Sequence, residues 1–315
     1  MIVTVTLNPA LGVRYDAEWV ALGAANQVSG VRYHAGGRGL TVARLLQTFG
    51  HEVVAAGLAG GSSGELIKAD LARAGVATQF TRISAESRRG VRIADAGTGQ
   101  VTTLEEPAPY ITTEELGRLA ADYRAMLDGA TAVVLCGSLP AGLPAETYAS
   151  LTSYAVEAGV PVILNADGSA LRHGAKRQPA LVIPEAGASE SELMAAGAGA
   201  VVLLTGNGVR AVTAEREWHA SVGHSAVQPA TVEPATVEPT TGEPITGEPA
   251  TGERATGRRD ALVAGFVPGI ALGWTWPDML RHALALADSV TPDGEADLAV
   301  YEKLLPEVKV AGPRS

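Results

Sequence analysis

The stretch TAVVLCGSLPAGLPAETYASLTSYAVEAGVPVILNADG, residues 131–168, decides the fold class of this sequence. It begins with a short apolar run that leads into a loop rich in glycine and proline. A segment with the apolar spacing of a helix follows, and a second apolar run, VPVILN, comes directly after it. A strand, a helix and another strand in this order are typical of an α/β protein.

The same alternation continues outward in both directions. MIVTVTL at the start is a β-branched run that ends at Asn8 and Pro9, as a strand followed by a turn would. Toward the other end, residues 258–273 and 276–290 have helical spacing. We therefore predict an α/β fold with a mainly parallel central sheet that helices cover on both faces. Ligands of such sheets bind at the carboxyl ends of the strands, so the loops there are the candidate site.

Two segments do not fit this rhythm, residues 12–35 and residues 88–104. Both are rich in short strands, and the second reads as a hairpin about a turn at residues 97–99. We predict that they form a small β-lid attached to a single domain spanning residues 1–315.

A five-residue repeat occupies residues 229–258, from PATVE at its start to RATGR at its end. Its proline, threonine, glutamate and glycine cannot bury enough apolar surface to order the segment. We predict a disordered insertion there. It runs without a break into the helical segment that begins ATGRRDALVAGF, so Asp260 is either the last charge of the tract or a working residue of a site.

Composition excludes several classes of protein. Apolar residues make up 46% of the 315, which is enough for a sizeable core, and the net charge of −10 without a basic tract argues against nucleic acid as a partner. No apolar run approaches the roughly 20 residues of a membrane span, and the N-terminus lacks the features of a signal peptide. The single cysteine, Cys136, excludes an internal disulfide, and the six histidines show no metal-ligand spacing. We expect a cytoplasmic protein with no membrane partner and no metal site built from its own side chains.

Eight short motifs follow one another along the chain: TVTLNPAL, AGGRGLTVARLL, GLAGGSSGELI, ESRRGV, CGSLPAGLP, VILNADGSAL, TGRRDALVAGF and DLAVYEKLLPEVKV. In this order they resemble the ribokinase-like (phosphofructokinase B) sugar kinases, and among these the 1-phosphofructokinase and tagatose-6-phosphate kinase branch. The resemblance covers nearly the whole chain. It implies a three-layer ribokinase-like sandwich with a β-lid, ATP and Mg²⁺ as cofactors, a sugar phosphate as substrate, and a homodimer formed through the lid.

The resemblance implies a catalytic role for the end of the repeat. The family motif Thr-Gly-Ala-Gly-Asp stands here as Thr-Gly-Arg-Arg-Asp, with Asp260 as the general base. Gly257 and its neighbours would offer free backbone amides at a helix start to the transferring phosphate, and Gly257 would also contact the nucleotide. Arg258 and Arg259 replace the small middle pair, and guanidinium groups bind phosphate well. Without the resemblance, a helix N-cap is the plainer interpretation of Asp260.

The motifs on the sugar side are partly retained. Gly36, Gly37 and Arg38 match the family's glycine-rich loop and its cation at the sugar phosphate. Thr41 replaces an asparagine that binds the sugar. Gly12 replaces an aspartate that holds sugar hydroxyls, so that contact is expected to be lost.

Three further residues complete the sugar side. Asn8 and Ser138 match the loops beneath the sugar, and Arg88 matches the arginine that meets the substrate phosphate. From the residues alone, Arg88 is equally well a solvated charge on the lid, and Ser138 an ordinary turn serine.

The nucleotide side departs further from the family. Thr205, Gly206 and Gly208 keep a glycine-rich turn where the family contacts the nucleotide, although a plain β-turn explains them nearly as well. Ala188 stands where the family has a glutamate that organises Mg²⁺ and phosphates.

Two hypotheses follow from this mixture. The first is an enzyme that phosphorylates a sugar phosphate, most plausibly fructose 1-phosphate or tagatose 6-phosphate, with ATP. The second is a catalytically impaired relative that binds a sugar phosphate or acts as a regulator.

Overall fold

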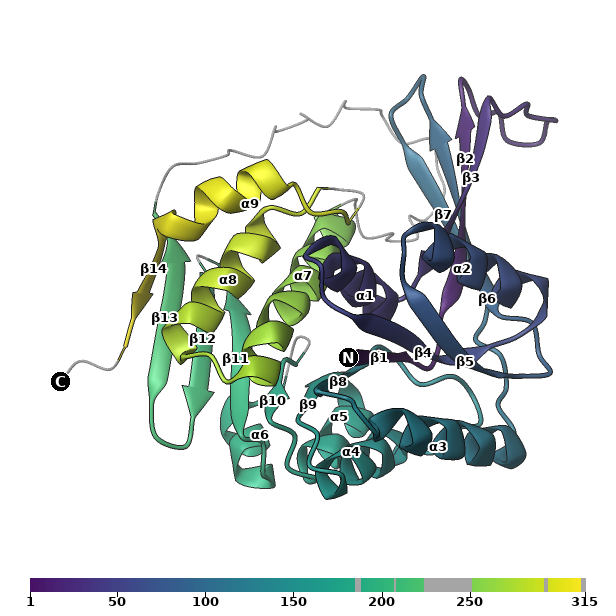
Figure 1. The fold of residues 1–315 in the computed structure, drawn as a ribbon. Coiled ribbons are helices and arrows are strands. Elements are labelled where there is room, and N and C mark those ends of the chain that lie inside the picture. Colours follow the sequence, from purple (N-terminus) through teal and green to yellow (C-terminus); the bar gives the residue numbers. More distant parts are fainter. Residues whose placement is uncertain (185–187, 207, 224–250, 292–293, 313–315) are drawn as a thin grey trace.

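The computed structural model describes residues 1–184, 188–206, 208–223, 251–291 and 294–312 of the chain. In this part, a ten-stranded sheet lies at the centre of the molecule, in the order β14-β13-β12-β11-β10-β9-β8-β1-β4-β5 (Figure 1). Its strands are β1 (Ile2–Thr6), β4 (Val53–Ala59), β5 (Ala77–Arg82), β8 (Ala132–Cys136), β9 (Val162–Asn165), β10 (Leu181–Val182), β11 (Ala200–Thr205), β12 (Gly208–Thr213), β13 (Glu217–Val222) and β14 (Val308–Ala311). The strands from β5 to β11 pair in parallel, and β12, β13 and β14 extend the sheet antiparallel. The predicted α/β class with a mainly parallel sheet is confirmed.

Helices cover both faces of this sheet, which gives the predicted three layers (Figure 1). One layer contains α1 (Arg38–Thr48), α2 (Gly61–Arg73), α7 (Thr251–Leu272), α8 (Trp276–Asp288) and α9 (Leu298–Leu304), followed by the short 3₁₀ helix η1 (Leu305–Glu307). The other contains α3 (Thr113–Leu127), α4 (Thr147–Glu157), α5 (Gly168–Ala175) and α6 (Glu190–Ala196). Successive residues of β1 alternate between the two cores: Ile2 belongs to the first, and Val3 and Val5 to the second.

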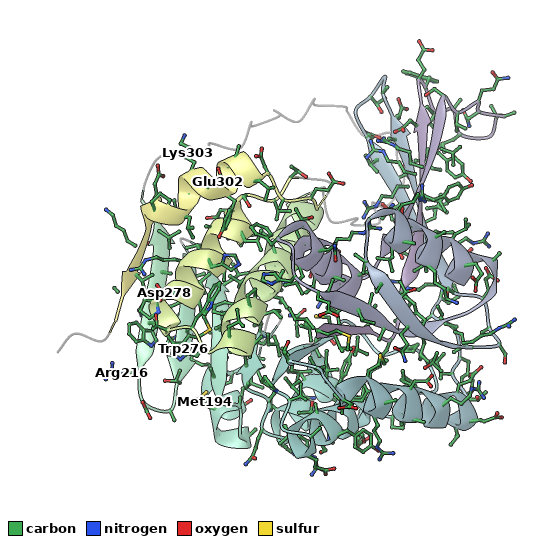
Figure 2. All side chains as sticks on the ribbon, in the orientation of Figure 1. Met194, Arg216, Trp276, Asp278, Glu302 and Lys303 are labelled. Atoms are coloured by element: carbon green, nitrogen blue, oxygen red, sulfur yellow. The ribbon has the colours of Figure 1, made fainter. Side chains whose placement is uncertain are left out.

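Within the first layer, α8 runs the length of the sheet. Figure 2 places Trp276 and Asp278 where α8 begins, and Glu302 and Lys303 on α9 at the opposite end of the layer. Since α7 and α8 are antiparallel neighbours joined by a short connection, the end of α8 lies beside the start of α7.

A second sheet of four strands forms the lid, in the order β3-β2-β6-β7. These strands are β2 (Ala10–Ala17), β3 (Gly30–Gly36), β6 (Arg88–Asp95) and β7 (Val101–Glu105). They lie in and beside the two predicted lid segments, and β6 and β7 form the predicted hairpin. Figure 1 shows the lid standing beyond the large sheet on the side where α7 begins.

Helix α7 starts earlier than the repeat composition predicts. Residues 229–250 of the predicted insertion lie outside the described residues, but residues 251–258 form the first turns of α7. The expectation of disorder is wrong for those eight residues. Glu253, Arg254 and Ala255 are good helix formers, and adding residues to an existing helix costs far less than nucleating a new one.

None of the helices in the described ranges combines the length and the apolar character that crossing a membrane requires.

Candidate active site

Asp260 lies on α7 with 3% of its surface exposed. Burial raises the pKa of its carboxyl to about 7, against the opposing effects of Arg38, Arg259 and a hydrogen bond with the Thr41 side chain. Its Oδ1 atom is buried without a hydrogen-bond partner. The site therefore holds a carboxylate that titrates near neutral pH and has one oxygen left to accept a proton.

Arg258 and Arg259 point in different directions, because successive residues of a helix are about 100° apart. Burial and the charge of Arg38 lower the pKa of Arg259, while the charge of Asp260 opposes this change. Arg258 instead donates from Nε to Oδ1 of Asp288 at 2.6 Å, which ties α7 to the end of α8. The structure thus brings Arg259 to Asp260 and Arg38, and engages Arg258 elsewhere.

Gly257 does not begin a helix. Because α7 starts at Thr251, the amides of residues 257–260 point along the helix toward carbonyls four residues earlier. The predicted helix start with free amides at Gly257 is wrong for this structure. A Cβ on Gly257 would lie 3.6 Å from Cγ1 of Val290, so this face of the helix packs against the segment after α8.

The start of α1 has the geometry that the start of α7 lacks. Gly37 precedes the helix with φ of 129°, and no side chain caps the first turn. Leu40 and Thr41 donate to the Gly37 carbonyl at 2.9 and 3.0 Å. The helix therefore begins at Arg38 with uncapped amides and a guanidinium group, and both features favour an anion.

The loop before α1 is held close to β1 and β2. A Cβ on Gly36 would lie 3.2 Å from the carbonyl oxygen of Ala10, and one on Gly37 would lie 2.9 Å from Cγ2 of Thr6. A Cβ on Gly39 would overlap the Thr6 hydroxyl. These glycines allow the start of α1 to approach the carboxyl end of β1 closely.

Asn8 and Ser138 join two loops at the same edge of the sheet. Asn8 follows β1 and donates from Nδ2 to Oγ of Ser138, after β8, at 3.2 Å. Asn8 Oδ1 is buried without a hydrogen-bond partner. The hydroxyl of Tyr148 lies 2.9 and 3.0 Å from the carbonyl oxygens of Cys136 and Gly137, and so supports the second loop from α4.

Cys136 lies next to the reactive carboxylate. Burial raises the pKa of its thiol, the charge of Asp260 raises it further, and Arg38 has the opposite effect. The thiol is therefore neutral, as expected for a buried core cysteine.

Arg88 lies on the lid in register with Ala10. Its Nη1 donates to Oε2 of Glu105 at 2.6 Å, and its Nε is buried without a hydrogen-bond partner. The arginine therefore already has one carboxylate partner and retains one donor.

The predicted nucleotide-binding residues Thr205, Gly206 and Gly208 lie on the β11–β12 hairpin. Thr205 pairs with Gly208, while Thr205 and Gly206 are exposed beyond the carboxyl end of β11. Nearer the centre, Asn165 ends β9, donates from Nδ2 to the Ile183 carbonyl at 2.7 Å, and keeps a buried Oδ1 without a partner.

Comparison with known proteins identifies the family to which this chain belongs. Residues 6–197, more than half of the chain, match the model of the pfkB family carbohydrate kinases. The chain belongs to this family. The match ends before α7, so the Asp260 segment lies beyond it.

Solved structures of similar shape agree with the fold of a pfkB kinase. A protein from Staphylococcus aureus described as a phosphofructokinase aligns at 22% identity and a TM-score of 0.80, over 100% of both chains. A possible 1-phosphofructokinase from Thermotoga maritima aligns at 21% identity and 0.77, also over 100% of both. Phosphofructokinase-2 from Escherichia coli, in a tetrameric inhibited form, aligns at 20% and 0.77 over 97% of this chain and 98% of that one. At these identities the likeness shows the fold.

Sequence reasoning missed two side chains that contact residues of the candidate site. Glu105 pairs with Arg88, a contact that the register of the β6–β7 hairpin could have indicated. Tyr148 supports the Ser138 loop from a different element, and no local pattern in the sequence marks that contact.

Proposed function

We propose that this pfkB kinase transfers a phosphoryl group from ATP to a hydroxyl of a sugar phosphate, with Asp260 as general base. The observation that carries the proposal is the buried carboxyl of Asp260, whose pKa of about 7 lies near working pH and whose Oδ1 has no protein partner. A base is most effective when its pKa lies near the operating pH. The burial of Asp260 also suits phosphoryl transfer, because a site that excludes water limits hydrolysis.

The substrate phosphate is held by cations from two elements. Arg38 stands at the uncapped start of α1, and Arg88 retains a buried Nε donor on the lid. Two such groups favour a phosphorylated sugar over a free one, and we propose fructose 1-phosphate or tagatose 6-phosphate. Asn8, with Ser138, offers a buried amide oxygen to a sugar hydroxyl. Thr41 hydrogen-bonds Asp260 and would contact the sugar next to its reacting hydroxyl.

Arg259 takes over the work of a helix start at the transferring phosphate. The amides of residues 257–260 lie within α7, whereas the guanidinium group of Arg259 acts on Asp260 electrostatically. Cations aimed at the transferring group stabilise the charge that it carries in the transition state. The arginine at position 259 thus compensates for the backbone site.

The nucleotide side fits ATP and Mg²⁺ in outline. Thr205, Gly206 and Gly208 offer a turn at the carboxyl edge, and Asn165 Oδ1 is a buried acceptor without a partner. Among the described residues, no cluster of three or more His, Cys, Asp or Glu could hold a metal ion. A bound Mg²⁺ would neutralise phosphate charge and would be held mainly by phosphates and water, as is usual for this ion.

The test is ADP release with ATP and Mg²⁺ against fructose 1-phosphate, tagatose 6-phosphate, fructose 6-phosphate and free fructose. Phosphorus NMR of the product would identify the phosphorylated hydroxyl, and Asp260→Ala supplies the background. We expect turnover on one phosphosugar and none in the variant. Equal ADP release by wild type and variant on every substrate would contradict the proposal.

A second candidate is the catalytically impaired relative that binds a sugar phosphate. The observation in its favour is the early start of α7, which engages the amides that would otherwise hold phosphate. The double variant Arg258→Ala/Arg259→Gly separates the two functions. A large gain in turnover would show a site blocked by these arginines, while a loss would support the role of Arg259 given above.

The lid is also a candidate surface for a homodimer. Val31, Tyr33 and Leu104 are 43%, 46% and 56% exposed, and the strand register places them on one lid face. Sedimentation of wild type and Tyr33→Glu tests this proposal, and a monomeric wild type would contradict it.

A further inference from the structure

Two glycines lie side by side in the middle of the lid. Gly12 on β2 is in register with Gly90 on β6, with His34 on β3 opposite Gly12 and Glu105 on β7 opposite Gly90. These four residues therefore form one row across the sheet, with the side chains of the outer strands flanking two positions that have none.

Both outer side chains lean inward over the glycines. A Cβ on Gly12 would overlap the imidazole of His34, and one on Gly90 would lie 3.0 and 3.3 Å from the carboxylate oxygens of Glu105. The two glycines thus form a floor, and an imidazole and a carboxylate occupy the space above it.

This row is on the lid face that points away from α2. Leu11, Val13 and Ala35 alternate with the row and pack into the core beneath it, so the row lies on the other face. A Cβ on Gly36 would lie 3.9 Å from Nε2 of His34, and Gly36 directly precedes the start of α1. The imidazole therefore lies between the lid floor and the uncapped start of α1.

Arg88 extends the row into a cluster of three polar groups. It lies on the same lid face, because Ala10 and Arg88 are in register two residues before Gly12 and Gly90. Its Nη1 bonds Glu105, and its buried Nε has no protein partner, so the arginine has a donor to offer to a ligand oxygen.

We propose that His34 and Glu105 bind the hydroxyl groups of the sugar phosphate and so decide which sugar is accepted; this inference rests on the proposed function. A carboxylate accepts hydrogen bonds from sugar hydroxyls, so Glu105 binds the sugar, and the Nε donor of Arg88 remains for the phosphate. The imidazole of His34 has a nitrogen on each side of the ring and can both donate and accept. The contact that Gly12 was expected to remove is thus supplied by the facing strand.

The experiment measures the dissociation constant of fructose 1-phosphate, tagatose 6-phosphate and inorganic phosphate by calorimetry, together with ADP release. The proteins are wild type, His34→Ala, Glu105→Gln and the control Glu106→Gln, whose carboxylate neighbours Glu105 but pairs with Arg89 instead of Arg88. Each test variant should weaken sugar phosphate binding about tenfold, as expected for a lost hydrogen bond to a charged or buried group, and leave inorganic phosphate unchanged. The control should bind both as wild type does.

Gly12→Ala supplies an independent test that keeps His34. The new methyl group must displace the imidazole, so it should weaken sugar phosphate binding as much as His34→Ala does. Combining the two substitutions should add nothing further, because both remove the same contact. Additive losses would overturn the role of His34.

The outcomes separate this inference from the kinase proposal. Sugar phosphate binding within twofold of wild type in both His34→Ala and Glu105→Gln would overturn the inference alone. Selective weakening in the variants supports it, even if the wild type binds without turnover, a result that would contradict the kinase proposal alone. A wild type that binds neither sugar phosphate would overturn both.

Discussion

Helices α1 and α7 each carry a glycine followed by an arginine near the carboxyl edge of the sheet, but the two glycines have different positions in their helices. Gly37 precedes α1 with φ of 129°, and the helix begins at Arg38. Gly257 lies within α7, which begins at Thr251. Gly37 leaves the first amides of α1 available to an anion, whereas the amide of Gly257 lies within α7.

The chain that precedes a glycine–arginine pair decides whether the glycine starts a helix or lies inside one. Strand β3 leads into Gly37, and an extended chain that turns into a helix needs a residue free to adopt positive φ. Before Gly257 the chain contains helix formers, so the helix extends backward through the motif. The phosphate site that we propose at α7 therefore relies on side chains.

The largest expected effect concerns Asp260, the buried carboxyl on α7. Asp260→Asn should lower turnover by about a thousandfold, within the range for loss of a general base, and leave sugar phosphate binding intact. Asp288→Asn is the matched control, because Asp288 pairs with Arg258 at the end of α8. Similar losses in both variants would show that the charge at position 260 has no special role.

The next effect is the pH dependence of turnover. Since the pKa of Asp260 is about 7, kcat/KM should rise about tenfold per pH unit below 7 and level off above it. Arg259→Gln should move this limb to higher pH, because the charge of Arg259 lowers the pKa of Asp260. A limb that stays in place in the variant would assign the titration to the substrate phosphate.

The carboxyl of Asp260 should also make the free energy of unfolding fall as pH rises. Its pKa is raised in the folded state, from 3.8 to about 7, so the folded protein binds the proton more tightly. The stabilisation is complete below about pH 4 and is lost as pH rises through 7. Urea unfolding at pH 5 and pH 8 should show this decline in wild type and a smaller one in Asp260→Asn.

The smallest expected effect is on the free energy of unfolding when Gly257 and Gly37 are each replaced by alanine. Gly257→Ala should raise the free energy of unfolding by about 0.5–1 kcal/mol, because alanine is the better residue inside a helix and its Cβ would meet Val290 and Gly294 at the ordinary contact distances of 3.6 and 4.0 Å. Gly37→Ala should lower it by at least about 1–2 kcal/mol, because φ is positive and Cγ2 of Thr6 lies 2.9 Å from the new Cβ. Urea unfolding measures both, and equal signs would remove the contrast between the helix starts.

The strands and helices of the layers can be predicted from the sequence, because each depends on a local pattern of residues. The run of strand, helix and strand at residues 131–168 became β8, α4 and β9, in parallel register as expected. The resemblance also named the residues that meet at Asp260. Those residues, Arg38, Thr41 and Arg259, come from only two helices.

What the sequence could not predict depends on contacts between distant segments. The directions of Arg258 and Arg259 depend on where α7 begins, and the repeat hid that boundary. The position of His34 over Gly12 depends on the register of β2 and β3. It also requires a residue without a side chain at position 12. From the sequence alone, Gly12 indicates only a lost contact.

We propose that the guanidinium group of Arg259, rather than the amides of a helix start, holds the transferring phosphate. The most direct measurement is kcat/KM for Arg259→Gln beside Arg258→Gln, two neighbouring substitutions on one helix with the same chemistry. We predict a loss of about 100-fold in the first, typical of removing a group that stabilises transition-state charge, and little change in the second. Equal losses, or a gain in Arg259→Gln, would contradict the account.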